Sequence, residues 1–259
     1  MKKAKRFYRN AAIGRADGGF SVLLENRPVR TPAGARLVLP TAVLAAAVVN
    51  EWLAQSETLR PETMPLTRLA ATALDRIGPY RAAVVDALAE YAGSDLICYR
   101  AEDPLELVAL QTALWQPLVD WAAQACGAQL AVCAGVLPLV QPQPALDALR
   151  AMIEATSDRQ LAALASVVPA SGSLVVALAM LHGRLDAEGA VEAALLDERW
   201  QAERWGVDQE AEARRAEIAD DIRSAALFLS LASEEVTPVL LPGDAAAIAI
   251  SGTSPGWSG

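Results

Sequence analysis

A change of pattern near residue 40 limits what this chain can fold into. Residues 6–40 hold short β-prone runs separated by glycine and proline, whereas the sequence from Thr41 to Glu235 follows a mainly helical period. The DGG at residues 17–19 and the ENRP at residues 25–28 have the composition of turns. The pattern therefore predicts a small antiparallel meander followed by helices.

We predict an α+β fold with three parts. Residues 1–100 form a β-rich N-terminal domain with flanking helices, residues 101–235 form a mainly α-helical bundle, and residues 236–259, rich in Pro, Gly, Ser and Ala, form a flexible tail. Helices are expected over residues 41–55 with Thr41 as the cap, 66–78, 80–93, 104–127, 144–155, 158–168, 172–183, 187–205 and 208–232.

Charge and hydropathy exclude several classes of partner. The net charge is −9 and the pI is about 4.8, which argues against nucleic acid and against anionic membrane surfaces. No window contains the run of about 18 apolar residues that a membrane span needs, so no stable membrane insertion is expected. The basic start MKKAKRFYR lacks an apolar stretch behind it and does not resemble a secretory signal. Three cysteines without metal spacing favour reduced thiols in a cytosol-like compartment.

Common signatures of enzymes are missing from the sequence. It contains no phosphate-binding G-x-x-x-x-G-K-[ST], no dinucleotide-binding G-x-G-x-x-G and no G-x-S-x-G nucleophile elbow. His182, the single histidine, precedes Gly183 at the end of an apolar helix, where a capping role is ordinary. Ser171 and Ser173 suit a loop and a helix start. We therefore predict no catalytic residue, no metal and no cofactor.

The segment DERWQAERWGVDQEA, from Asp197 to Ala211, combines two tryptophans with five carboxylates. In a helix Trp200 and Trp205 lie about 140° apart, so they should not share a face. We predict that Trp200 packs in the core and that Trp205 covers a different contact. Gly206 is expected to end the helix in a left-handed conformation, and Asp208 to cap the next helix.

The position of Glu203 in this segment is not explained by a role in the core or in a helix cap. It follows Leu196 and Trp200 on one helical face and so interrupts an apolar stripe. A carboxylate there needs a partner, either Arg199 or Arg204 or a group on another protein.

A second candidate surface lies in MPLTRLAATALDR, at residues 64–76. The helix predicted over residues 66–78 has an apolar stripe at Leu66, Leu69, Ala73, Leu74 and Ile77. Helical spacing predicts that Arg68, Thr72 and Arg76 share a face that contacts a partner, although a solvated helix face is the commoner outcome.

Eight fragments in this order resemble the assembly chaperones of the catalytic head of F-type ATP synthase. The resemblance covers residues 5–233 and rests on KRFYR, FSVLLENRPVRTPAGARLVLP, EWLAQ, MPLTRLAATALDR, DLICYRA, LQTALWQPLVDW, SGSLVVALA and DERWQAERWGVDQEA. It implies a β-rich N-terminal domain followed by an orthogonal helical bundle. It also implies a chaperone, not an enzyme, that binds the unassembled alpha subunit, prevents its aggregation and hands it to the beta subunit.

The resemblance also points to the acidic residues around the WG turn. The matching positions are Glu203 and Asp208, and we expect a partner-binding site made of Glu203, Asp208, Trp205, Arg68 and Arg76. The chain is expected to be a monomer in the bacterial cytoplasm, or in the mitochondrial matrix if its source is eukaryotic. The alternatives are a hydrolase in which Glu203 and Asp208 converge on a closed pocket, and a general helical scaffold for many apolar clients.

Overall fold

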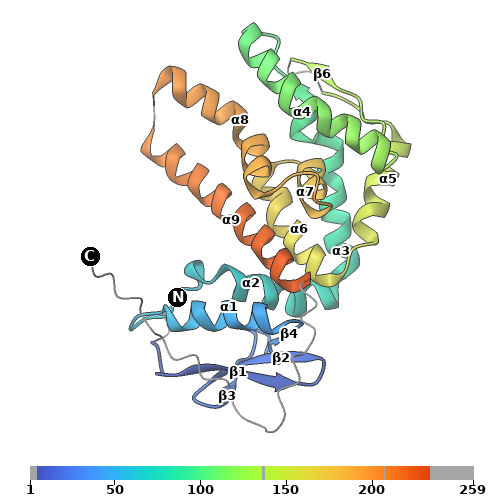
Figure 1. Cartoon of the computed structure of the whole chain (residues 1–259). Coiled ribbons are helices and arrows are strands. Elements are labelled where there is room, and N and C mark those ends of the chain that lie inside the picture. Colours follow the sequence, from blue (N-terminus) through green and yellow to red (C-terminus); the bar gives the residue numbers. More distant parts are fainter. Residues whose placement is uncertain (1–4, 136–137, 207, 234–259) are drawn as a thin grey trace, which may run out of the picture. The chain divides into compact units, whose positions relative to one another are not determined.

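The computed structural model describes residues 5–135, 138–206 and 208–233, and the predicted tail at residues 236–259 lies outside this part. The predicted α+β class is confirmed, with a small antiparallel sheet near the N-terminus followed by helices (Figure 1). The chain divides into two compact units, residues 1–71 with 231–259, and residues 72–230. The domain ranges predicted from the sequence stay predictions.

The sheet of the first unit is built around one strand. Strand β2 (Gly19–Leu24) pairs antiparallel with β1 (Ala11–Ala16), and also with the two short strands β3 (Arg27–Pro28) and β4 (Val38–Leu39). The ENRP turn is confirmed, because Glu25 and Asn26 have φ values of 48° and 63°, which suit a tight hairpin turn. The sheet differs from a simple meander because β4 returns to β2.

Helix α1 (Ala42–Leu53) packs on β1 and β2 through fully buried residues such as Leu44 and Val48. Thr41 caps it as predicted, since its Oγ1 accepts a hydrogen bond of 3.1 Å from the Leu44 amide. The same hydroxyl donates a bond of 2.6 Å to the Leu231 carbonyl, which fixes the end of the described chain to the first unit.

The helix expected over residues 66–78 is interrupted. After the short 3₁₀ turn η1 (Pro61–Thr63), helix α2 covers Pro65–Thr72 and a π-helical segment η2 covers Ala73–Ile77. The wider π turn shifts the angular position of each following residue. Leu74, predicted to lie on the apolar stripe, is therefore 38% exposed, while Ala73 and Ile77 are buried.

The second unit contains most of the helices. They are α3 (Gly78–Ala89), α4 (Leu105–Ala125), α5 (Gln143–Glu154), α6 (Asp158–Ser171), α7 (Leu174–Leu181), α8 (Ala187–Trp205) and α9 (Gln209–Ser233), which enters the first unit at Leu231. The 3₁₀ turns η3 (Glu90–Ser94) and η4 (Leu96–Cys98) lead into β5 (Tyr99–Arg100), which pairs in parallel with β6 (Cys133–Ala134). No helix in the described ranges is long and apolar enough to cross a membrane.

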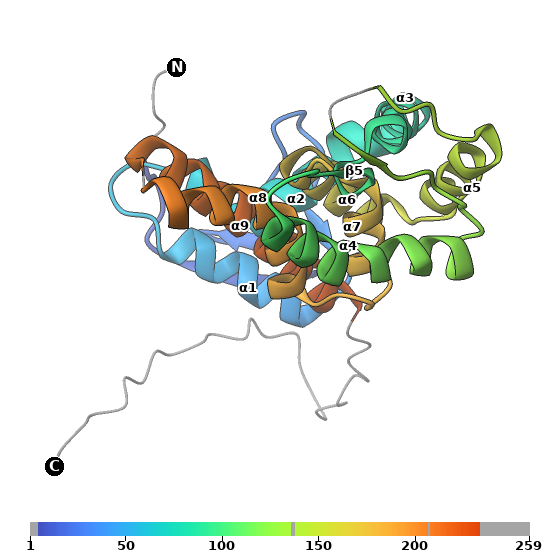
Figure 2. The same ribbon diagram turned by 90° about the horizontal axis from the view of Figure 1, so that it is seen from above.

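Helix α7 forms the centre of this unit. Residues 174–180 are all buried, and α7 packs among α4, α6 and α8 (Figures 1 and 2). Ser173 caps the helix as predicted, accepting a 3.0 Å bond from the Val176 amide, and Gly172 ends α6 in the left-handed conformation. His182 caps the C-terminal end of α7, also as predicted.

Candidate functional site

Most of the fragments that carry the family resemblance bond to one another inside the fold. In KRFYR, the Tyr8 hydroxyl donates 2.6 Å to the Trp52 carbonyl at the end of α1. In EWLAQ, the Glu51 carboxylate accepts bonds of 2.7 and 2.8 Å from the amides of Leu66 and Thr67, and so caps α2. These fragments therefore build the first unit.

Two further fragments position α8 within the second unit. On α4, the Gln111 Nε2 donates 2.8 Å to the Asp197 carboxylate, and the Trp115 Nε1 donates 2.9 Å to the Ala193 carbonyl. Trp115 is fully buried. Burial raises the pKa of Asp197, against the opposing effects of Gln111 and Arg100. Because these bonds anchor the middle of α8, its last turn is held on a rigid base.

The last turn of α8 carries an exposed indole. Trp200 is 8% exposed and belongs to the core as predicted, whereas Trp205 is 75% exposed. The two indoles nevertheless touch, with their centroids 5.9 Å from each other in an edge-to-face arrangement that helical spacing does not predict. The rings can touch because a tryptophan side chain is long enough to reach around the helix from a Cα that lies on another face. Trp205 thus rests on Trp200 and presents its remaining surface to solvent.

An ion pair connects this turn to the start of α4. Arg204 stacks on the Trp200 ring, with its guanidinium carbon 4.4 Å from the centroid, and pairs with Glu106. Next to Glu106, Leu105 is 78% exposed. The residues next in sequence to the two partners of this ion pair, Trp205 and Leu105, are therefore both exposed and apolar. The sequence gives no signal for Leu105, because an apolar residue at a helix start is ordinarily part of a buried stripe.

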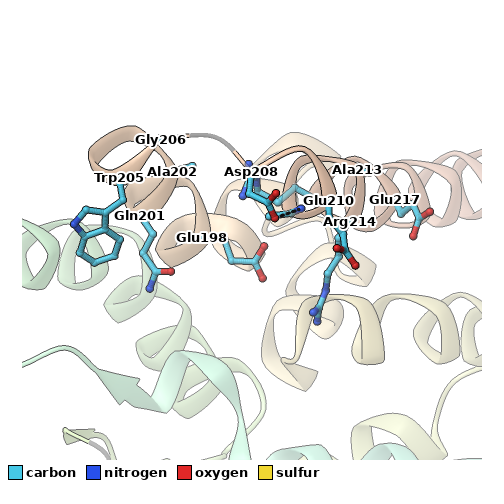
Figure 3. A pocket seen from close by; sticks show the side chains of 12 residues that line it. Glu198, Gln201, Ala202, Trp205, Gly206, Asp208, Glu210, Ala213, Arg214 and Glu217 are labelled. Carbon is cyan, nitrogen blue, oxygen red and sulfur yellow. Dashed lines mark hydrogen bonds between the residues drawn. The ribbon is translucent and has the colours of Figure 1, made fainter.

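The WG corner has the predicted helix end and the predicted cap, but not the predicted conformation of its glycine (Figure 3). Helix α8 ends at Trp205, and Gly206 has φ 92° and ψ 165°, a conformation that is open almost only to glycine but is not the expected left-handed helical one. Asp208 precedes α9, and its carboxylate accepts a 3.2 Å bond from the Ala211 amide. The cap is confirmed, and the second oxygen of Asp208 makes no hydrogen bond within the part of the chain that the structure describes.

Glu203 is exposed, which corrects one step of the sequence argument. The carboxylate does not lie in an apolar environment, because the last turn of α8 extends beyond the core that buries Leu196 and Trp200. Arg204 pairs with Glu106 instead. Within the ranges that the structure describes, Glu203 makes no side-chain hydrogen bond or ion pair. It lines a hollow of about 400 Å³ between α8 and α9.

A larger hollow of about 790 Å³ lies on another side of the same two helices (Figure 3). Trp205 and Asp208 line it, together with Glu198, Gln201, Glu210, Arg214, Arg215 and Glu217. Arg215 is buried between the helices, and its only partner among the described residues is Glu212, at 2.5 and 3.2 Å. The surface around the exposed indole is therefore rich in carboxylates and open to solvent.

Arg68 and Arg76 lie in different elements, Arg68 in helix α2 and Arg76 in the π-helical segment η2. Arg68 belongs to the first unit and Arg76 to the second, and both are exposed. Arg68 lines a mainly apolar hollow of about 280 Å³ within the first unit.

The geometry of the acidic segment does not form a catalytic pocket. Glu203 and Asp208 are both exposed and line different hollows, so they do not converge on a shared reacting atom. Within the described ranges, no group of three or more His, Cys, Asp and Glu side chains is placed to hold a metal ion. The arrangement suits contact with another protein: a rigidly held aromatic residue surrounded by charges.

Comparison with known proteins gives one consistent result. Residues 5–123 match the family model described as ATP12 chaperone protein. The chain is 42% identical to Atp12 from Paracoccus denitrificans, whose crystal structure superposes with a TM-score of 0.82 over 88% of this chain and 98% of that one. A variant of the Paracoccus protein with an aspartate replaced by lysine matches with 41% identity and a TM-score of 0.81, over the same shares of the two chains. Over 238 residues the chain is 26% identical to the mitochondrial protein atp12 of Schizosaccharomyces pombe, covering 86% of this chain and 81% of the relative.

Proposed function

The chain belongs to the ATP12 chaperone family, which serves the assembly of ATP synthase and is not an enzyme family, and from this premise we propose that it holds one particular subunit. The proposed client is the unassembled alpha subunit. The chaperone binds it, keeps it from aggregating and hands it to the beta subunit. In bacteria this takes place in the cytoplasm, and in a eukaryotic source it takes place in the mitochondrial matrix.

The exposed Trp205 is the observation that carries this proposal. An indole buries about 150–250 Å² when it is covered, and aromatic residues of this kind dominate the affinity of many interfaces. Trp205 is 75% exposed, although the bonds from α4 hold its helix firmly. A subunit without its assembly partners exposes apolar surface that promotes aggregation, and a rigid aromatic residue can cover part of that surface.

Carboxylates beside Trp205 supply the selectivity of the proposed site. Glu203 has no partner among the described residues, and Asp208 uses one oxygen for its cap. Charges at the rim of an interface favour a complementary partner and accelerate association more than they increase affinity. We propose that they face basic groups of the client, and that the exposed Arg68 and Arg76 contribute further contacts. A moderate affinity of this type permits later release to the beta subunit.

The two alternatives have less support. A carboxylate-based hydrolase needs Glu203 and Asp208 in one enclosed site, whereas both are exposed and line separate hollows. A general scaffold needs a broad apolar surface, whereas half of the residues that line the hollow beside Trp205 are charged. The charged surface favours one dedicated client.

The test is an aggregation assay with purified alpha subunit. Light scattering of the alpha subunit alone should rise after dilution from denaturant, and an equimolar amount of the chaperone should suppress that rise. Glu203→Lys should abolish the suppression while the circular dichroism spectrum and the melting temperature stay at the wild-type values.

The matched control is Glu192→Lys on the same helix. Glu192 is also exposed, and it lies 11 residues earlier, about 16 Å along the helix axis. Glu192→Lys should keep full suppression. An equal loss of suppression in Glu203→Lys and Glu192→Lys would show that suppression depends on the net charge of the chaperone and not on the position of Glu203. No complex with the alpha subunit for the wild-type protein would overturn the proposal, and equal suppression for unrelated clients would favour the general scaffold.

A further inference from the structure

We propose that the C-terminal segment Val236–Pro242 docks in the apolar hollow of the first unit. This hollow lies where the end of α1 meets α2 and the loop after β3. Its wall includes Trp52, Met64 and Leu37, and its volume is about 280 Å³. The inference does not depend on the proposed client, because the hollow and the segment belong to the same chain.

An unsatisfied donor lies in the wall of the hollow. The Nε1–H of Trp52 is buried and finds no acceptor among the described residues, although the indole lines the hollow. A buried indole N–H normally has a hydrogen-bond partner, and leaving it without one costs about 1–3 kcal/mol. Because this N–H has almost no accessible surface, a backbone carbonyl of an inserted segment becomes its acceptor through a small rotation of the indole toward the hollow.

The chain enters the first unit at a suitable place. Leu231 is fixed to Thr41 at the start of α1, and Trp52 lies 11 residues further along this helix, about 16 Å away along its axis. Helix α9 ends at Ser233, and the seven residues from there to Leu240 span up to about 23 Å when extended. The segment is therefore long enough to reach the hollow.

Composition favours this segment over the other terminus. The sequence VTPVLLP is apolar, and its two prolines restrict the unbound chain, which lowers the entropy that docking must remove. Glu234 and Glu235 precede it and Asp244 follows it, while Arg30 and Arg68 line the hollow. The N-terminal sequence MKKA carries positive charge and is repelled by the same arginines. Since the segment is tethered, its effective concentration at the hollow is in the millimolar range.

Photo-cross-linking tests the placement. A benzoylphenylalanine is introduced at Leu241 of the full chain, and in a second protein at Ile250 as the control outside the docking segment. After irradiation, mass spectrometry should find cross-links from position 241 to residues 29–37 and 59–71 of the same molecule, and few from position 250. Cross-links from position 241 mainly elsewhere, or between two copies, would overturn the proposal.

Hydrogen exchange provides a second measurement that does not need the probe. The double variant Leu240→Asp, Leu241→Asp should lose the protection of residues 29–37 by at least about ten-fold, which corresponds to about 1.4 kcal/mol of docking free energy. The matched control Ile248→Asp, Ile250→Asp makes the same chemical change in the same tail and should leave the exchange at the wild-type rate. Equal exchange in all three proteins, or a protection that depends on protein concentration, would contradict the intramolecular docking.

Discussion

The carboxylate of Asp95 gives the most quantitative prediction from this structure. Asp95 is fully buried and accepts bonds from the amides of Ile97, at 3.3 Å, and Val175, at 3.0 Å. Burial raises its pKa from 3.8 to about 6, although bonds from Ser173 and from backbone amides oppose the shift. The residue therefore joins DLICYRA to the start of α7, the helix at the centre of the second unit.

The sign of the pH dependence follows from the protons that each state binds. Between pH 3.8 and 6 the folded state keeps the Asp95 proton while the unfolded state loses it, so the folded state is favoured at the lower pH. As the pH rises through this window, the free energy of unfolding falls. The total change is about 3 kcal/mol, since the pKa difference of about 2.2 is worth about 1.36 kcal/mol for each unit. About 1.3 kcal/mol of this total falls between pH 5 and pH 7.

The test compares the wild-type protein with Asp95→Asn. Asparagine keeps the shape but does not titrate, so urea unfolding at several pH values between 5 and 8 gives the Asp95 contribution as a difference. The wild-type free energy of unfolding minus that of Asp95→Asn should decrease by about 1.3 kcal/mol from pH 5 to pH 7. Asp186→Asn, which makes the same change at an exposed cap of α8, serves as the control. A constant or increasing difference for Asp95 would refute the argument that desolvation outweighs its hydrogen bonds.

Three further variants test separate parts of the structure. Glu51→Ala removes the acceptor that caps α2 and should lower the free energy of unfolding by about 1–3 kcal/mol, measured by urea denaturation. Gly206→Ala places a side chain at φ 92° in open space, so it should cost about 1–3 kcal/mol from backbone strain alone, seen as faster hydrogen exchange in the last turn of α8. Trp205→Ala should weaken the complex with the alpha subunit by about 2 kcal/mol, about 30-fold in Kd by calorimetry, while the exposed control Tyr80→Ala keeps the wild-type affinity. An unchanged result for any of the three would contradict the role given to that residue.

The helices were predictable because their signals are local. Caps and periodicity place the ends of the last helices within a few residues, and Thr41, Ser173 and Asp208 all act as caps. The π-helical segment at Ala73–Ile77 was not predicted, because an apolar stripe such as Leu66–Leu69–Ala73–Ile77 reads equally well as an uninterrupted α-helix. No residue type in this segment distinguishes a π-helical turn from an α-helical one. Leu74 was therefore predicted to lie on the buried face, whereas it is exposed.

The candidate site was predictable only in part. The corner at Gly206 follows from residue type, whereas the contact between Trp200 and Trp205 depends on side-chain rotamers that helical spacing does not give. The exposure of Glu203 depends on how far α8 extends beyond its neighbours, and this is a property of tertiary packing. Tertiary packing also pairs Glu106 with Arg204. The exposure of the neighbouring Leu105 could therefore not be predicted from the sequence.

Internal bonding also separates the residues that build the chaperone from those that are free to bind a client. Substitution of Glu51, Asp95 or Gln111 breaks bonds inside the fold, so loss of chaperone action there is accompanied by loss of stability. Trp205 and Glu203 are exposed at the end of a helix that α4 already fixes, so their substitution changes what the surface offers without releasing α8. Client affinity can be plotted against the free energy of unfolding for variants of both groups. Variants of Glu51, Asp95 and Gln111 should lose affinity in proportion to the stability they lose. Variants of Trp205 and Glu203 should lose affinity at nearly wild-type stability, and so fall well below that line. Points for Trp205 and Glu203 that fall on the same line would show that this turn supports the fold and that the client binds elsewhere.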